Sequence, residues 1–239
     1  MTDEIVKHAG FQSTMQTLRL LMTIDTDEAT AITKTAVKDG TRGLAARGIS
    51  VLQRWNEARF GEALLDELED MKRAGQIRED FNQTDAGVSS LREFFDLIDG
   101  KPDEERFRAF CALFMSANAP DADSSEAILD LELMSILRRL SAGEMHLLSA
   151  LLRVRIYKVG EDLEGLLAKA VGYNSRALVI KNVKALLDES LVNKETWTVR
   201  SGSTGNEKQL LTDLGMALLE RVKKYNEFKE KGKAEFASK

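Results

Sequence analysis

Apolar side chains recur every three or four residues along most of the first 140 positions of this chain, which is the spacing of amphipathic α-helices. Only 2 prolines occur in the 239 residues, and aromatic residues make up 6% of them. A sandwich of short strands uses aromatic residues and turn-forming prolines more freely. We therefore predict a mainly α fold.

The pattern divides residues 1–140 into five or six helical segments. The clearest spans 44–74 and is predicted to end at Gly75, a residue typical of helix C-termini. Later segments are expected to begin at Thr84, near Pro102 and at about Glu126. Their apolar positions form the candidate core: Leu52, Trp55, Leu64, Leu65, Leu68, Met71, Leu91, Phe94, Phe95, Ile98, Phe107, Phe110, Cys111, Phe114, Ile128, Leu131, Met134, Ile136 and Leu137.

Charge is divided unevenly along the chain. Residues 138–239 hold 19 Lys and Arg against 13 Asp and Glu, whereas residues 1–137 hold 15 against 26. This asymmetry predicts two domains, an acidic helical bundle at 1–140 and a basic domain at 141–239. The basic domain is suited to phosphates or to an acidic partner, although a solvated surface or attraction between the two halves explains the charge as well.

Several classes of protein are excluded by what the sequence contains. A single cysteine, Cys111, rules out a disulfide framework and a cysteine-based zinc site, and it is expected to be a core thiol. Two distant histidines, His8 and His146, leave little for histidine catalysis. No apolar run approaches 18 residues, and the first residues lack a signal peptide's apolar core. We therefore expect a cytoplasmic protein without membrane contact.

Motifs of the common enzyme classes are missing too. Gly40–Gly43 lacks the Gly-Lys-Ser/Thr end of a phosphate loop, and no Gly-x-Ser-x-Gly elbow occurs. The acidic stretch at 121–126 lacks the glycine that a calcium loop needs. The sequence therefore predicts no enzyme, no cofactor and no metal.

The C-terminal third has a different order of elements. Ser141 and Glu144 have the spacing of a capping box, which starts a helix. A short strand at 154–159 follows, then helices at 161–171 and 176–189. Two strands, 196–200 and 208–211, flank a polar turn and predict a β-hairpin. Thr212 is predicted to cap a last helix at about 214–231.

This order of elements resembles a winged helix-turn-helix domain over about 141–225. The segment 186–192 (LLDESLV) is similar to the exit of the recognition helix in MarR- and PadR-type proteins, and 211–219 (LTDLGMALL) is similar to their run after the wing. Gly215 is expected to permit a close approach. Ser190 departs from these families, which have a glycine with a left-handed backbone at that position.

The resemblance implies a recognition helix at 176–189 with Val179, Val183 and Leu186 facing the core. Its outward face, the turn before it and the wing would then contact duplex DNA. The candidate DNA-binding residues are Asn174, Ser175, Arg176, Lys181, Lys184, Arg200, Ser201, Ser203, Thr204 and Lys208. Ile180 on the same face favours a protein partner instead, and Asp188 and Glu189 would repel phosphates.

Two further expectations concern partners. The last helix carries Leu211, Leu214, Leu218, Val222 and Tyr225 near heptad spacing, which predicts either a homodimer through helices or packing within the chain. The helical half, with Leu140–Glu144, is loosely similar to bacterial abortive-infection alpha-type proteins. Two functions follow: a DNA-binding regulator of bacterial or phage type, or a non-enzymatic adaptor or regulatory subunit that binds a protein, with phage defence as one setting.

Overall fold

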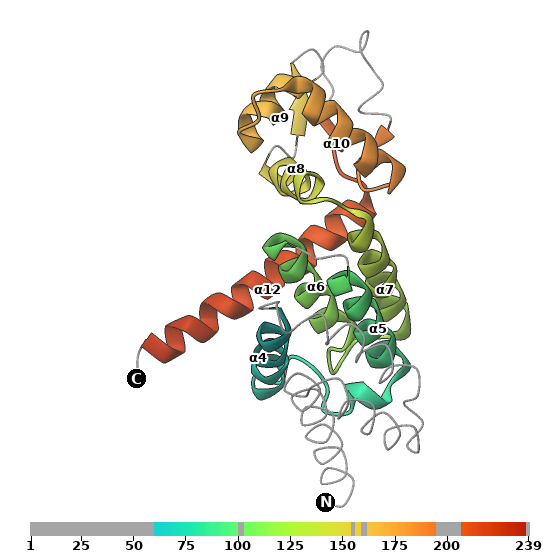
Figure 1. Ribbon diagram of the computed structural model, residues 1–239, viewed down its shortest axis with the longest axis vertical. Helices are drawn as coiled ribbons and strands as arrows, with labels where there is room; N and C mark the ends of the chain where they lie inside the picture. Colours follow the sequence, from blue (N-terminus) through green and yellow to red (C-terminus); the bar gives the residue numbers. More distant parts are fainter. Residues whose placement is uncertain (1–59, 100–102, 154–155, 159–161, 195–206, 238–239) are drawn as a thin grey trace, which may run out of the picture. The chain divides into compact units, whose positions relative to one another are not determined.

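The computed structural model describes residues 60–99, 103–153, 156–158, 162–194 and 207–237 (Figure 1). Helices dominate these ranges, which confirms the mainly α prediction. The elements, in chain order, are α4 (Phe60–Arg73), the 3-10 turn η2 (Phe81–Gln83), α5 (Asp85–Asp99), α6 (Glu104–Ala117), α7 (Ser124–Arg139), α8 (Ala142–Arg153), β1 (Ile156–Lys158), α9 (Leu163–Val171), α10 (Arg176–Asp188), β2 (Glu207–Gln209) and α12 (Asp213–Ala237). The elements predicted before residue 60 and at 196–206 lie outside the described ranges.

The chain divides into two compact units. The first unit comprises 1–102 and 110–135, and the second comprises 103–109 and 136–239. The division therefore falls at 135/136, close to the boundary predicted at 140/141, and the second unit also takes in the first turns of α6. Each unit has buried apolar residues of its own, and the two are described separately below.

The core of the first unit is built around phenylalanine. Phe81, Phe94, Phe110 and Phe114 are each no more than 1% exposed. The ring centroids of Phe94 and Phe110 lie 4.8 Å apart, and those of Phe81 and Phe114 meet edge to face at 5.4 Å. Such aromatic pairs contribute about 0.5–1.5 kcal/mol beyond their buried area. Cys111 is buried on α6, the helix that carries Phe110 and Phe114, as predicted for a core thiol.

Two of the core residues predicted on α7 are not buried: Leu131 is half-buried and Ile128 is exposed. Ile128 is 66% exposed. The buried face of this helix is set by Ala127, Asp130, Met134 and Leu137, which follow one another at three- and four-residue steps. Ile128 lies one residue, about 100°, away from Ala127 and so points to solvent.

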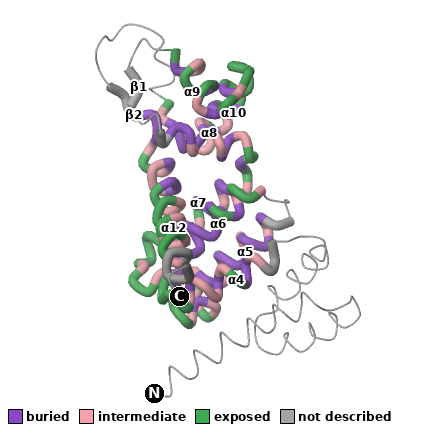
Figure 2. Tube along the Cα trace, turned by 90° about the vertical axis from the view of Figure 1, so that its left-hand side faces the viewer, coloured by how far each residue is buried: buried purple, intermediate pink, exposed green. Residues whose placement is uncertain are grey.

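The second unit packs α8, α9 and α10 around one small core, with the buried side of each helix facing the others (Figure 2). Leu147, Leu167, Val179, Val183 and Leu186 are fully buried there. The predicted capping box is present: the Ser141 backbone N–H donates to the Glu144 carboxylate at 2.6 Å, and the Glu144 N–H donates to the Ser141 hydroxyl at 3.4 Å. These two bonds fix the start of α8.

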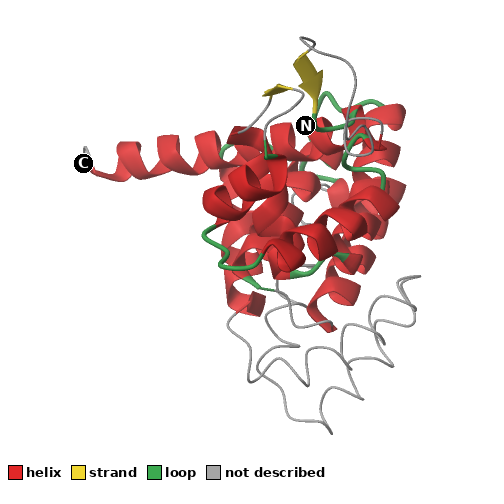
Figure 3. Ribbon diagram, turned by 90° about the horizontal axis from the view of Figure 1, so that it is seen from above, coloured by secondary structure: helices red, strands yellow, loops and turns green. Residues whose placement is uncertain are grey.

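Two short strands form the only sheet in the described part of the chain (Figure 3). Ile156, Tyr157 and Lys158 of β1 pair antiparallel with Gln209, Lys208 and Glu207 of β2. An isolated bridge joins Val192 to Leu211, and the Asn193 N–H donates to the Leu210 carbonyl at 2.9 Å.

The β-hairpin predicted between 196–200 and 208–211 is not supported by the described residues, in which the partner of β2 is β1. Residues 195–206 lie outside the described part of the chain. Local strand propensity located β2, but a strand's partner is set by tertiary packing, which a local pattern does not contain.

Two helices, one in each unit, begin with the same four-residue arrangement. In Thr84–Gly87 and in Thr212–Gly215 the sequence is Thr-Asp-x-Gly. The threonine hydroxyl accepts a bond from the glycine N–H, at 3.0 Å in α5 and 3.1 Å in α12, so each threonine is an N-cap. The same hydroxyls donate to the carbonyls of Phe81, at 2.8 Å, and Ser190, at 2.6 Å. Both caps therefore tie a helix start to an earlier segment.

Candidate nucleic-acid interface

Helix α10 has one buried and one exposed side, as the sequence predicts. Val179, Val183 and Leu186 are fully buried, and Asn182 is only 3% exposed. Ala177, Ile180, Lys181 and Lys184 are exposed on the opposite side. Each of these four residues lies three or four positions from two of the others, and together they define what we call the outer face of α10.

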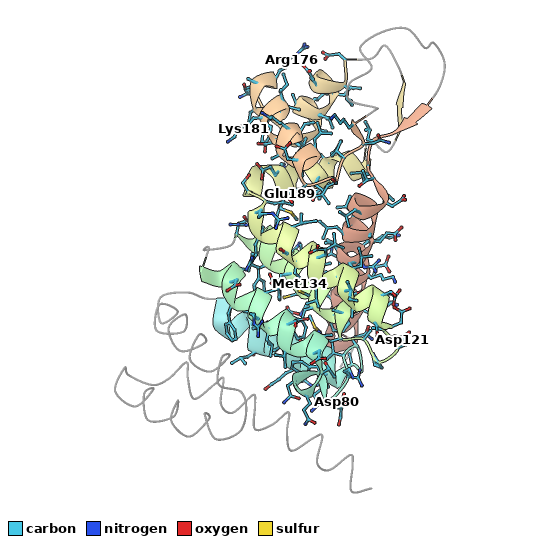
Figure 4. The ribbon with its side chains drawn as sticks, turned by 90° about the vertical axis from the view of Figure 1, so that its right-hand side faces the viewer. Asp80, Asp121, Met134, Arg176, Lys181 and Glu189 are labelled. Atoms are coloured by element: carbon cyan, nitrogen blue, oxygen red, sulfur yellow. The ribbon has the colours of Figure 1, made fainter. Side chains whose placement is uncertain are left out.

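Lys181 and Lys184 are the cations of the outer face. Neither makes an ion pair with a carboxylate of the residues that the structure describes. Figure 4 shows Lys181 on the outer side of α10, between Arg176 at one end of the helix and Glu189 at the other. Both ammonium groups are therefore available to a ligand.

Arg176 is less available for contact with a phosphate than the sequence predicts. Its guanidinium makes a salt bridge with the Asp162 carboxylate. The same carboxylate caps α9 by accepting the Gly165 N–H at 3.0 Å. Asp162 therefore anchors the start of α10 to the start of α9 and competes with any phosphate for Arg176. Asn174 and Ser175, just before α10, are exposed, and Ser175 makes no side-chain capping bond.

The remaining candidates belong to the predicted wing. Arg200, Ser201, Ser203 and Thr204 lie outside the described residues. Lys208 lies in β2, where its partner across the sheet is Tyr157.

A buried polar group fixes α10 against the start of α8. The Asn182 amide donates to the Tyr173 hydroxyl at 3.5 Å, and that hydroxyl donates to the Gly143 carbonyl at 3.1 Å. A Cβ at Gly143 would lie 2.9 Å from the Asn182 amide nitrogen, so this glycine allows the close approach. Nothing in the sequence indicates this connection, because its three members are separated by up to 39 residues.

The acidic end of α10 is partly neutralised. The Arg139 guanidinium at the end of α7 donates to both carboxylate oxygens of Glu189, at 2.8 and 2.6 Å. These hydrogen bonds lower the pKa of Glu189, with help from the guanidinium charge and against the effect of burial. The sequence predicts a repulsive charge at Glu189 and gives no sign of its pairing with Arg139, because the two residues are 50 positions apart.

This pair predicts a pH dependence. A carboxylate whose pKa is depressed by folding adds stability above its unfolded pKa, and the gain is lost as the pH falls through the folded pKa. Because Arg139 is half-exposed, we expect the pair to add no more than about 1 kcal/mol to the free energy of unfolding. The free energies of unfolding of the wild type and Glu189→Gln, measured in urea, should differ at about pH 7 and converge as the pH falls below the ordinary pKa of a glutamate carboxyl. A difference that stays constant over this range would contradict the assignment.

The exit from α10 has the left-handed residue that the resemblance implies, but on serine. Ser190 has φ 58°. The Leu191 N–H donates to the Leu186 carbonyl at 2.9 Å, and the Ser190 N–H donates to the Leu187 carbonyl at 3.0 Å. These are the two bonds of a Schellman motif. The same motif ends α4 at Gly75, as predicted, and α9 at Gly172, where φ is 65° and 71°.

Ser190→Gly is therefore expected to stabilise the protein by about 0.5–1 kcal/mol, because glycine adopts a positive φ without the Cβ penalty. Ser175→Gly is the matched control: φ is −134° there, so glycine gains nothing and costs backbone entropy. The midpoint temperature of thermal unfolding should rise for Ser190→Gly and should not rise for Ser175→Gly. Equal shifts in both would show that backbone conformation at Ser190 is not the cause.

Large apolar side chains are also exposed in this unit. Ile180 is 44% exposed, Leu166 of α9 is 42% exposed and Leu178 is 40% exposed. No group of three or more His, Cys, Asp or Glu side chains within the described ranges is placed to hold a metal ion. No helix in these ranges is both long and apolar enough to cross a lipid bilayer.

The stripe expected to pair α12 with a second copy is largely covered. Leu211 and Leu218 are 3% and 0% exposed, and Tyr225 is 3% exposed. These side chains are therefore already buried in a single chain, and a homodimer stays a prediction.

Comparisons of this chain with protein-family models, with curated proteins and with solved structures each find no match.

Proposed function

We propose that the second unit contains a winged helix-turn-helix that binds duplex DNA through α10, as in a regulator of bacterial or phage type. The order α8, β1, α9, α10, β2 and α12 supports this proposal, as does the pairing of β1 with β2 beside the three helices. The Val192–Leu211 bridge directly after α10 is what a second pairing at the base of a wing would require.

The observation that carries the proposal is the outer face of α10. A helix enters the major groove only with an uncovered side, and Lys181 and Lys184 give that side two unpaired charges for phosphates. The start of α10 adds Asn174 and Ser175 as hydrogen-bond donors. At the far end Arg139 offsets Glu189, so Asp188 is the exposed acidic residue of that turn.

A salt series of gel shifts tests this function. At about 50 mM salt the full chain should retard duplex DNA, and Lys181→Glu/Lys184→Glu should weaken binding at least ten-fold. Loss of two phosphate contacts should also lower the slope of log affinity against log salt by about two. Both lysines are exposed, so the variant is expected to fold normally.

The matched control is Lys224→Glu/Lys231→Glu, which makes the same charge change on exposed lysines of α12. This variant should bind nearly as the wild type does, apart from a small loss through long-range charge. Equal weakening by both double variants would assign binding to net charge rather than to α10. Absence of any shift at low salt would remove the DNA function.

The exposed apolar residues favour a second candidate, a non-enzymatic adaptor or regulatory subunit that binds a protein. Ile180, Leu178 and Leu166 are the observation behind it, since exposed apolar side chains serve protein contacts well. A role in phage defence follows only from the loose similarity of the helical half. Binding of this kind would depend on Ile180 and would change little with salt, which distinguishes it from DNA binding.

A further inference from the structure

The outer face of α10 combines two apolar residues with two lysines, and this combination limits what it can recognise. Ile180 and Ala177 are its apolar members, three residues apart, and Lys184 and Lys181 lie four residues after each of them. Such positions are neighbours on a helix surface. Ile180 is 44% exposed, so its side chain projects from the helix between charged neighbours.

Two side chains of α10 that could read bases by paired hydrogen bonds, Arg176 and Asn182, are engaged elsewhere. Arginine reads guanine and asparagine reads adenine in this way. The Arg176 guanidinium is paired with Asp162, and the Asn182 amide is buried against the Tyr173 hydroxyl. Lys181 and Lys184 are long point charges for which phosphate is a suitable partner.

The lysines also decide what kind of partner covers Ile180. An apolar protein surface seated on Ile180 would take the ammonium groups of Lys181 and Lys184 out of water without a counter-charge, which is costly. A DNA groove has phosphates along both rims and apolar methyl groups on its floor. The outer face therefore matches DNA in both its charge and its apolar centre.

Building on the proposed function, we infer that Ile180 contacts the 5-methyl groups of thymine in the major groove. The ligand is then duplex DNA with thymine at the contacted positions, read by apolar contact rather than by paired hydrogen bonds. The lysines hold the helix in place and carry no sequence information.

Matched duplexes of alternating A·T and A·U test the inference, because uracil differs from thymine only in lacking this methyl group. For each thymine methyl group that the protein touches, the full chain should bind the A·U duplex about four-fold more weakly. Ile180→Ala should bind both duplexes alike and keep the salt dependence of the wild type. Lys181→Gln/Lys184→Gln should bind both more weakly and keep the preference for A·T.

Ile128→Ala is the control, since it removes an isoleucine that is 66% exposed in the first unit and should retain the preference. Equal binding of both duplexes by the wild type would overturn the inference and leave DNA binding standing. A preference that survives Ile180→Ala would overturn the assignment to Ile180. No binding to either duplex at low salt would overturn the proposed function and this inference with it.

Discussion

Gly215→Ala is expected to destabilise the second unit by about 2–4 kcal/mol. A Cβ on Gly215 would lie 2.2 Å from the Leu191 carbonyl oxygen and 3.1 Å from the carbonyl carbon. The oxygen belongs to the backbone and cannot rotate away, because it accepts the Thr212 N–H at 3.2 Å. Relief of the clash would therefore shift the start of α12 from the exit of α10.

The same substitution further along α12 provides the control. A Cβ on Gly232 meets nothing within 4 Å, so Gly232→Ala should stabilise the helix by up to about 1 kcal/mol. The two free energies of unfolding, measured in urea, should thus change in opposite directions. A loss below about 1 kcal/mol at Gly215 would mean that the two segments separate easily.

Gly87→Ala is expected to destabilise the first unit by at least as much as Gly215→Ala destabilises the second. A Cβ there would lie 1.7 Å from the Phe81 carbonyl oxygen, which is closer than any real contact. This oxygen accepts the Thr84 N–H at 3.1 Å and the Thr84 hydroxyl at 2.8 Å. Phe81 itself is fully buried against Phe114, so its backbone cannot move without disturbing the core. A loss of about 3 kcal/mol or more follows.

Substitutions at Thr84 separate the clash from the loss of the cap. Thr84→Ser keeps the hydroxyl and should leave stability nearly unchanged, whereas Thr84→Ala should cost about 1 kcal/mol. Circular dichroism during urea unfolding gives all three values. If Gly87→Ala cost no more than Thr84→Ala, the close approach to Phe81 would not be a constraint.

Local signals predicted much of this fold. The capping box at Ser141, the helix end at Gly75, the cap at Thr212 and the close approach at Gly215 all appear as expected. Each depends on residues within a few positions of one another, or on the backbone freedom of one glycine. The buried face of α10, with Val179, Val183 and Leu186 towards the core, agrees with what the resemblance to a winged helix implies.

Contacts between distant residues could not be predicted. Arg139 and Glu189 are 50 positions apart, and the strand partner of 207–209 proved to be 156–158. The role of Asp162 as the N-cap of α9 could have been predicted, since an aspartate directly before an apolar helix is a typical N-cap. Its salt bridge with Arg176 could not, because that contact depends on how α9 packs against α10. Ile128 was misassigned because a list of apolar residues does not say which side of a helix faces the core.

The second unit is built from two separate stretches of chain, 103–109 and 136–239, and this limits how the protein can be shortened. The Arg106 side chain donates to the Leu140 carbonyl at 3.1 Å, and Glu105 lies 3.5 Å from the imidazole of His146. A fragment that begins at residue 141 would lack both Arg106 and Leu140, and would leave His146 without Glu105 and the Glu189 carboxylate without Arg139. Truncation at this point would therefore alter α10 itself, and point substitutions in the intact chain are the safer route to test it.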